Sequence, residues 1–431
     1  MVLKKPSNRR SLNIGFVSTR FSGTDGVSLE TAKWAEVLES MGHTCYYFSG
    51  LSDRPPERSM VVEEAFYRHP EIKERHDHFF TTNQRTKEET NWIHHWREIF
   101  RGHLYTFISE FGIDLLIPEN ALAIPLNIPL GLALTEVIAE TCLPTIAHHH
   151  DFAWERKRFL VSSIWDYIGM AFPPDLPSIW HVVINSQASH QLARRRGVGS
   201  DVIPNVMQYE KPPPGIDDFS SDLRQTLGLE EGELFVLQPT RVVRRKGIEH
   251  AVELVQRLNR KARLVISHAS GDEGDDYEHR IQEYADLLGV KTIFCSQIFD
   301  DERHVTADGH KIYSLWDAYP QADLVTYPSV FEGFGNAFLE AIYFRKPIVV
   351  NNYSIYATDI RPKGFQVIEF DDFVSSGTIK QTLEVLDSPH LQTEMAEKNY
   401  KLALRHFSYT LLHNKLKVQI ANAFGMNGEP V

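Results

Sequence analysis

Residues 324–343 combine a short apolar run, a glycine-containing loop and a helical pattern. The run Leu-Val-Thr-Tyr is typical of a buried strand and stops at Pro328, which cannot continue it. After Gly335, apolar residues recur at the three- and four-residue spacing of a helix. This order predicts a strand, a loop and a helix, which is the repeating unit of an α/β fold.

Two carboxylates, Glu332 and Glu340, bracket this loop and the start of the predicted helix. Glycine lets a ligand approach bare backbone, and the first N–H groups of a helix attract anions. Carboxylates accept hydrogen bonds from sugar hydroxyls. The pattern therefore favours a ligand with hydroxyls at both ends and phosphate between them, such as a nucleotide-sugar. The alternative is an ordinary loop and helix whose glutamates face solvent.

Length and charge limit the class of protein. A chain of 431 residues with 42% apolar residues predicts a globular protein of two domains. Its net charge of −12 argues against nucleic acid as the main partner. Cys45, Cys142 and Cys295 are widely spaced and odd in number, which favours core thiols in a reducing compartment.

The sequence shows neither a signal peptide nor a membrane span. Residues 1–10 are basic and polar and lack the apolar core of a signal peptide. No apolar run reaches the length of a membrane span, so we expect a cytoplasmic protein. The basic run at 194–196 leaves peripheral membrane contact as an alternative to a solvated helix face. The oligomeric state is not predicted.

The chain shows two successive βα rhythms. The first has strands near 12–18, 44–48, 113–118, 144–149 and 181–185, interrupted by a charged insertion at about 51–100. The second has strands near 234–238, 263–267, 291–295, 324–328 and 347–351. We expect domains at 1–204 and 205–405, with a helix at 406–431 that crosses back to the first domain.

Cations follow the first strand of the second rhythm. Arg241 comes directly after the strand at 234–238, and Lys246 precedes Gly247 at the start of the next helix. Cations at the carboxyl edge of a parallel sheet, beside a helix start, suit a phosphate. The alternative is a solvated basic turn. A run of three histidines, 148–150, invites a metal site, but neighbouring side chains in a strand point to opposite faces. His148, His150 and Asp151 could still share a face, and a core histidine is a further alternative.

Together these motifs resemble the retaining glycosyltransferases of family 4, which have the GT-B fold of two Rossmann-like domains facing a central cleft. The Glu332–Glu340 segment carries the resemblance, supported by Arg241, Lys246 and the loop at 23–27. That loop has Asp25 where the family often has glycine, and Val206 stands where it often has glycine after asparagine. The loop could also be a plain βα turn.

The resemblance implies a role for each matched residue. Glu332 would bind the transferred sugar and Glu340 the ribose, while Arg241 and Lys246 would stabilise the leaving diphosphate. His150, six residues after Pro144, would hydrogen-bond the sugar. Glu119 and Asn120, at the end of an earlier strand, are candidates for the acceptor. The remaining donor-binding candidates are backbone positions on the two loops, namely Gly333, Phe334, Gly335, Asn336, Ala337, Gly26 and Val27.

The expected activity is metal-independent transfer of a hexose with retention, with no cofactor. UDP-glucose is the favoured donor type and GDP-mannose the alternative. The acceptor is a saccharide, a glycerate-type molecule or a lipid-linked sugar. Two other functions stay open: a nucleotide-sugar-binding protein without transferase activity, and a nucleotide-sugar epimerase.

Overall fold

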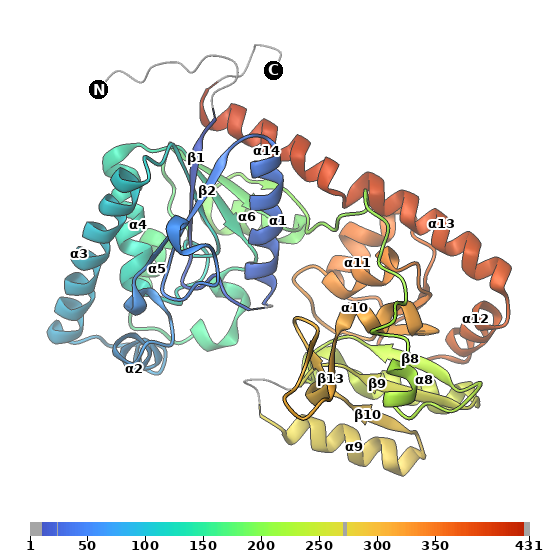
Figure 1. Ribbon diagram of the computed structural model, residues 1–431. Helices are drawn as coiled ribbons and strands as arrows, with labels where there is room; N and C mark the ends of the chain where they lie inside the picture. The colour runs from blue at the N-terminus through green and yellow to red at the C-terminus, as the bar shows by residue number, and fades with distance from the viewer. Residues whose placement is uncertain (1–10, 24, 270–273, 426–431) are drawn as a thin grey trace. The chain divides into compact units, whose positions relative to one another are not determined.

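The computed structural model describes residues 11–23, 25–269 and 274–425, which form two compact units (Figure 1). Unit 1 comprises residues 1–204 and 410–431, and unit 2 comprises residues 205–409. Each unit is built on a parallel sheet with helices packed against it, which confirms the α/β, Rossmann-like character expected from the two sequence rhythms. Thr24 of the glycine-containing loop lies outside the described residues, as do residues 1–10.

The sheet of unit 1 has seven strands in the order β3-β2-β1-β4-β5-β6-β7, and every pair is parallel. Its central strands are almost fully buried, because helices cover them on both faces. The strands are β1 (Asn13–Val17), β2 (Thr44–Ser49), β3 (Ser59–Val61), β4 (Leu115–Pro118), β5 (Thr145–His149), β6 (Ile179–Val183) and β7 (Asp201–Val202).

The insertion at 51–100 forms α2 (Pro70–Phe79), the first half of α3 (Lys87–Glu110) and the edge strand β3. The last helix of the chain belongs to this unit, where the Gln419 amide donates to Asp201 over 2.7 Å. The other helices are α1 (Gly26–Ser40), α4 (Ile128–Thr141), α5 (Trp165–Ala171), α6 (Ser186–Arg196) and α14 (Tyr409–Ala423).

The sheet of unit 2 has six parallel strands in the order β10-β9-β8-β14-β15-β16. The strands are β8 (Leu234–Gln238), β9 (Ala262–Ile266), β10 (Thr292–Phe294), β14 (Leu324–Tyr327), β15 (Ile348–Asn351) and β16 (Ile368–Phe370). The helices are α7 (Leu223–Thr226), α8 (Ile248–Leu258), α9 (Asp276–Leu288), α10 (Leu315–Ala318), α11 (Asn336–Tyr343), α12 (Ser376–Leu386) and α13 (Pro389–His406).

A small three-stranded sheet in unit 2 was not expected from the sequence. It consists of β11 (Phe299–Asp300), β12 (His304–Val305) and β13 (Lys311–Ser314), in the order β11-β13-β12. Strands of two to four residues give too short an alternation to be recognised in a sequence.

Two other expectations concern single features. Cys45 and Cys295 are buried, but Cys142 is exposed, so the prediction of three core thiols was wrong for Cys142. Cys142 ends α4 in the left-handed conformation, which places it at the surface end of that helix.

Across the described residues, every helix is too short or too polar to cross a bilayer.

Candidate active site

Lys246 and Glu332, predicted separately from two motifs, form an ion pair in unit 2. Lys246 ends the short helical turn Arg244–Lys246 that follows β8, and Glu332 lies in the loop after β14. Since β8 and β14 are neighbouring parallel strands, both residues lie at the carboxyl edge of the sheet. The ammonium group of Lys246 donates to one carboxylate oxygen of Glu332. The guanidinium group of Arg245 donates to the other oxygen over 3.0 Å.

Close backbone contact holds these two loops together. The N–H of Val330 donates to the carbonyl of Arg245 over 2.9 Å. Gly247 has a φ of +57°, and a Cβ atom there would lie 2.7 Å from the carbonyl oxygen of Pro328. A side chain at position 247 would therefore push the loops apart. Glycine thus explains why Lys246 can reach Glu332.

Burial and charge act in opposite directions on this pair. Lys246 is 8% exposed and Glu332 is 7% exposed. Burial raises the pKa of Glu332, but the cations of Lys246 and Arg245 outweigh it and leave the pKa below its ordinary value. Burial lowers the pKa of Lys246 more than Glu332 raises it. Glu332 is consequently ionised at neutral pH and held by two cations.

Two further basic groups lie beside the pair. Arg241 is exposed and its side chain forms no hydrogen bond or ion pair with any described residue, yet its charge lowers the pKa of Lys246. Burial, together with the charges of Lys246 and Arg241, lowers the pKa of His268 to about 4. Sequence reasoning gave no role to Arg245 or His268. The basic run 244–246 and the position of His268 just after β9, the neighbour of β8, were the available signals.

The start of α11 supplies the backbone donors that the sequence predicted. Gly335 has a φ of +141°, and a Cβ there would collide with the hydroxyl of Tyr353. That hydroxyl donates to the carbonyl of Phe334 over 2.8 Å and fixes the turn. The N–H groups of Gly335, Asn336 and Ala337 donate to no acceptor among the described residues. The loop therefore presents unused donors at a helix start.

Glu340 lies in the second turn of α11 and is partly exposed. Its carboxylate accepts a hydrogen bond of 2.7 Å from the hydroxyl of Tyr319, whose ring stacks on Phe344. Tyr319 is a residue that the sequence analysis missed, because it is 21 positions away and carries no motif. The phenol fixes the direction of the carboxylate.

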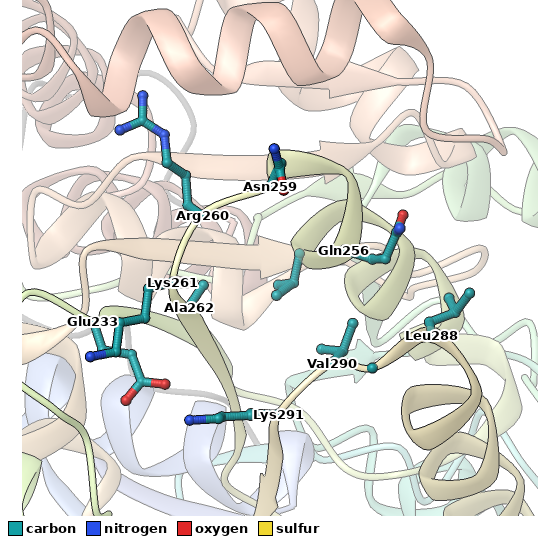
Figure 2. Close-up of a pocket in the computed structure, with 11 residues that line it drawn as sticks. Glu233, Gln256, Asn259, Arg260, Lys261, Ala262, Leu288, Val290 and Lys291 are labelled. Carbon is teal, nitrogen blue, oxygen red and sulfur yellow. The ribbon is translucent and has the colours of Figure 1, made fainter.

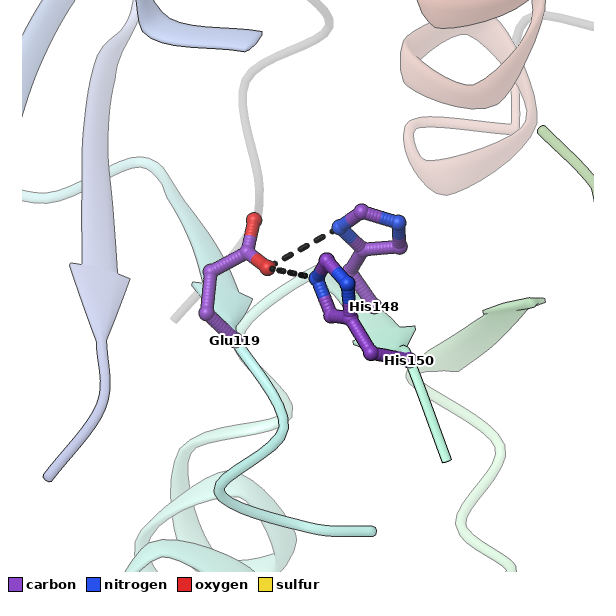
Figure 3. A group of neighbouring side chains, drawn as sticks. All are labelled: Glu119, His148 and His150. Atoms are coloured by element: carbon purple, nitrogen blue, oxygen red, sulfur yellow. Dashed lines mark hydrogen bonds and ion pairs between the residues drawn. The ribbon is translucent and has the colours of Figure 1, made fainter. Parts of the chain in front are cut away.

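His150 and Glu119 lie together in unit 1 (Figure 3). Oε2 of Glu119 lies 2.9 Å from Nδ1 of His148 and 3.1 Å from Nε2 of His150. Glu119 is completely buried, whereas the His150 ring above it retains 9% exposure. Contact of Glu119 with an acceptor stays a prediction.

Asn120 ties the two loops of this cluster together. It adopts a φ of +58°, and its side-chain oxygen accepts the N–H of His150 over 3.0 Å. Its amide nitrogen donates to Asp151 over 2.8 Å. Asn120 is 6% exposed and so is engaged by the protein itself. No contact of Asn120 with an acceptor is supported by this arrangement.

The spacing of Glu119, His148 and His150 would also suit a metal ion. One ligand-type atom from each lies within 4.8 Å of the others, and no other such group occurs in residues 11–23, 25–269 and 274–425. Both ring nitrogens share a single carboxylate oxygen at ordinary hydrogen-bond distances. Hydrogen bonds therefore account for the geometry, and we interpret the group as a hydrogen-bonded cluster.

The helix start of unit 1, which contains Gly26 and Val27, is capped by the protein itself. The carboxylate of Asp25 caps α1 and accepts the N–H groups of Val27 and Ser28 over 3.1 and 3.3 Å. The guanidinium group of Arg20 forms an ion pair with the Asp25 carboxylate, with nitrogen and oxygen 2.8 Å apart. The N–H of Val27 is therefore already bonded to a protein carboxylate, at the position where the sequence departs from glycine. Donor binding by Gly26 and Val27 stays a prediction.

A pocket of 470 Å³ in unit 2 lies away from these residues (Figure 2). It is lined by residues that precede the strands, including Glu233 before β8 and Lys291 before β10. It thus opens at the amino edge of the sheet, opposite Lys246 and Glu332. Lys261 and Lys291 are both paired with Glu230, and Arg260 is paired with Asp387, so each cation that lines this pocket already has a carboxylate partner.

Comparison with known proteins agrees with the fold. The family model for glycosyl transferases group 1 matches residues 219–402. The chain is 30% identical to a mannosylglucosylglycerate synthase of Thermotoga maritima, over 95% of this chain and 100% of that protein. It is 32% identical to a protein of the same name from Petrotoga mobilis, over 83% of this chain and 86% of that protein.

Solved structures share the fold at low sequence identity. A glycosyltransferase from Rickettsia africae has a TM-score of 0.68 at 13% identity, covering 97% of this chain and 100% of that one. A sucrose-phosphate synthase from Thermosynechococcus elongatus has a TM-score of 0.65 at 15% identity, with coverage of 97% and 100%. These confirm the GT-B fold. The chain therefore belongs to the glycosyl transferases of group 1 and is a nucleotide-sugar-dependent glycosyltransferase.

Proposed function

We propose that the protein transfers mannose from GDP-mannose to glucosylglycerate, with retention at the anomeric carbon and without a metal ion. The similarity to the Thermotoga maritima protein carries the proposal, because it extends over 95% of this chain and all of that protein. The name of that relative describes a mannosyl group joined to glucosylglycerate. It supports a glycerate-type acceptor, and it favours a mannose donor over the UDP-glucose type expected from the sequence.

The donor diphosphate is assigned to unit 2. The unused N–H groups at the start of α11 and the cations Arg241, Arg245 and Lys246 are at the carboxyl edge of one sheet. Charge that builds on the leaving diphosphate would be stabilised there by groups already in place. Glu340, on the second turn of α11, is assigned to the ribose hydroxyls.

The ion pair of Glu332 suggests how the donor sugar is bound. Glu332 is held by Lys246 and Arg245. A bound diphosphate would draw both cations toward itself and leave Glu332 free to accept sugar hydroxyls. In this scheme Glu332 is a sugar-binding group and not a nucleophile. Retention would then come from attack on the same face that the diphosphate leaves, assisted by that diphosphate.

A donor and acceptor screen tests the substrate. The purified protein is incubated with glucosylglycerate and either GDP-mannose or UDP-glucose, in the presence of EDTA, and the products are analysed by NMR. We expect a single mannosylated product from GDP-mannose with the α-configuration of the donor, at a rate unchanged by EDTA.

Other outcomes would redirect the proposal. Transfer from UDP-glucose but not from GDP-mannose would restore the original donor expectation. An inverted product would contradict retention, and loss of activity in EDTA that Mg²⁺ or Mn²⁺ restores would contradict the metal-independent mechanism. Donor binding without transfer to any glycerate-type or saccharide acceptor would favour a binding protein. Conversion of the donor sugar to its epimer would favour an epimerase.

A further inference from the structure

Two atoms of the histidine cluster lack partners, and they define how its rings are arranged. Oε1 of Glu119 and Nε2 of His148 are enclosed by protein and form no hydrogen bond within the described part of the chain. The ring of His148 is fully buried and stacks on Trp34 with ring centres 4.1 Å apart. Since Nδ1 of His148 lies against the carboxylate, this ring carries its proton there and an unprotonated Nε2 in the core.

His150 has the opposite orientation. Its Nε2 faces Glu119, and its backbone N–H is fixed by Asn120. Its second ring nitrogen, Nδ1, forms no hydrogen bond with any described residue. Unlike Nε2 of His148, this nitrogen is not enclosed by protein. Of the two rings that share Glu119, only that of His150 can therefore offer a nitrogen to a ligand. Asn120 and Glu119 together leave this ring little freedom to turn.

We propose that Glu119 is a positioning residue for the transfer reaction, which holds the His150 ring by Nε2 so that Nδ1 donates a hydrogen bond to a substrate oxygen. The proposal rests on the proposed function for the identity of the ligand. It gives the buried carboxylate a role through His150, in place of direct contact with an acceptor.

The charges around His150 support this arrangement. Burial lowers the pKa of His150, but the hydrogen bond and charge of Glu119, with the charges of Glu30 and Asp151, outweigh it and raise the pKa above its ordinary value. The pKa of His148 is instead lowered, mainly by burial, so that ring stays neutral. The same carboxylate therefore lies beside one ring whose pKa is raised and one whose pKa is lowered.

The sign of the pH dependence follows. If protonated His150 is the active form, the rate falls as pH rises through its raised pKa. Replacing Glu119 by glutamine removes the negative charge and lowers the pKa of His150. The alkaline limb of the rate profile should then move to lower pH, by about one unit or more for loss of an adjacent charge.

The main test is a double-mutant cycle of E119Q, H150Q and the combined variant, assayed with GDP-mannose and glucosylglycerate. We expect kcat of E119Q to fall about 10- to 100-fold, which is at the lower end of the effect of losing a group that transfers or holds a proton in the reaction. Each KM should change less than about threefold. We also expect the double variant to be no slower than H150Q, because Glu119 acts only through that ring. Losses that multiply in the double variant would overturn the proposal.

The matched control is E89Q. Glu89 is a second buried carboxylate of unit 1 that contacts a histidine, since its Oε1 lies 3.1 Å from Nε2 of His78. It caps the start of α3 and has no place in the proposed site. We expect E89Q to lose thermal stability while its pH profile stays that of the wild type. A shift of the profile in E89Q equal to that in E119Q would contradict a specific role for Glu119.

An NMR titration of the histidines separates this inference from the proposed function. The His150 signals are assigned by comparison with H150Q, and the wild-type protein is titrated without substrate. A His150 pKa above its ordinary value, together with a neutral His148 protonated at Nδ1, is expected whatever the substrate is. A His150 pKa at or below its ordinary value would overturn the proposal even if transfer is observed. Because the titration uses the wild-type protein, it tests the proposal even if E119Q does not fold. Stoichiometric zinc in the purified protein, lost together with activity on chelation, would overturn it in favour of a metal site.

Discussion

The two units place a helix start at the carboxyl edge of a parallel sheet and treat it in opposite ways. In unit 1 the start of α1 is closed by Asp25, whose carboxylate takes the N–H groups of Val27 and Ser28. In unit 2 the start of α11 is left open, and its neighbouring loop carries Arg245 and Lys246. The same local geometry therefore attracts an anion in one unit and is already satisfied in the other.

The difference has a simple cause in the residue at the cap. Asparagine, aspartate and serine are good caps because their short side chains reach back to the helix N–H groups. Position 25 is such a residue, whereas the cap of α11 is Gly335, which has no side chain to donate or accept. A glycine cap costs some helix stability and keeps the donors available for a ligand.

Loss of Lys246 should have the largest effect on the open site. We expect K246A to reduce kcat about 100- to 1000-fold, the range for removal of one preorganised group that stabilises developing charge. Glu332 stays partly neutralised by Arg245, so the protein should still fold. Rates are measured with saturating donor and acceptor, and folding is checked by thermal unfolding.

K346A is the matched control for this variant. Lys346 is also a partly buried lysine of unit 2, but it comes just before β15, at the amino edge of the sheet. Its ammonium group donates to the carbonyl of Pro320. It should lose stability and keep its rate per folded molecule. Wild-type transfer by K246A would exclude the diphosphate role of this residue.

A side chain at position 335 should close or displace the open helix start. In G335A the new methyl group meets the Tyr353 hydroxyl and the φ of +141° becomes strained. Strain of about 1–3 kcal/mol at such a site is expected to shift the loop, and we expect donor affinity to fall about tenfold or more. Binding of GDP-mannose is measured by calorimetry.

G364A controls for strain alone. Gly364 has a φ of +88°, but a Cβ there meets nothing within 4 Å, and the position lies outside the proposed site. It should lose stability without a change in donor affinity. Equal loss of affinity in both variants would mean that the open start of α11 has no special part in donor binding.

Removal of the Asp25 cap should have the smallest effect on transfer. We expect D25A to cost about 0.5–2 kcal/mol of unfolding free energy, as for other lost caps, while kcat and both KM values stay within about threefold of the wild type. D25N should recover most of the stability, because asparagine is an equally good cap. Thermal unfolding and steady-state rates check both variants.

The cap of α12 provides the comparison for D25A. Ser375 accepts the N–H of Thr378 over 3.0 Å, and S375A should show a stability loss of the same size. A large loss of transfer in D25A but not in S375A would mean that the loop at 23–27 binds substrate through Asp25 itself. The contrast between the two helix starts would then have to be abandoned.

Much of the fold could be predicted because the strands of a parallel sheet are short, continuous apolar runs bounded by loops. The strand at 234–238 was predicted with its observed limits, and the strand and helix around 324–343 were placed within two residues. The strands β11 and β12 were missed because two residues carry no pattern. The edge strand β3 was missed inside a polar insertion for a similar reason.

The sequence by itself determined the two α/β units and the residue types at their loop edges, because apolar periodicity and glycine placement are local properties. The tertiary structure decided which charges meet. Lys246 and Glu332 are 86 positions apart and pair only because β8 and β14 are neighbours. Glu119, a candidate for acceptor binding, is buried beneath His150. Burial and pairing depend on contacts distant in sequence, so no local pattern could have fixed them.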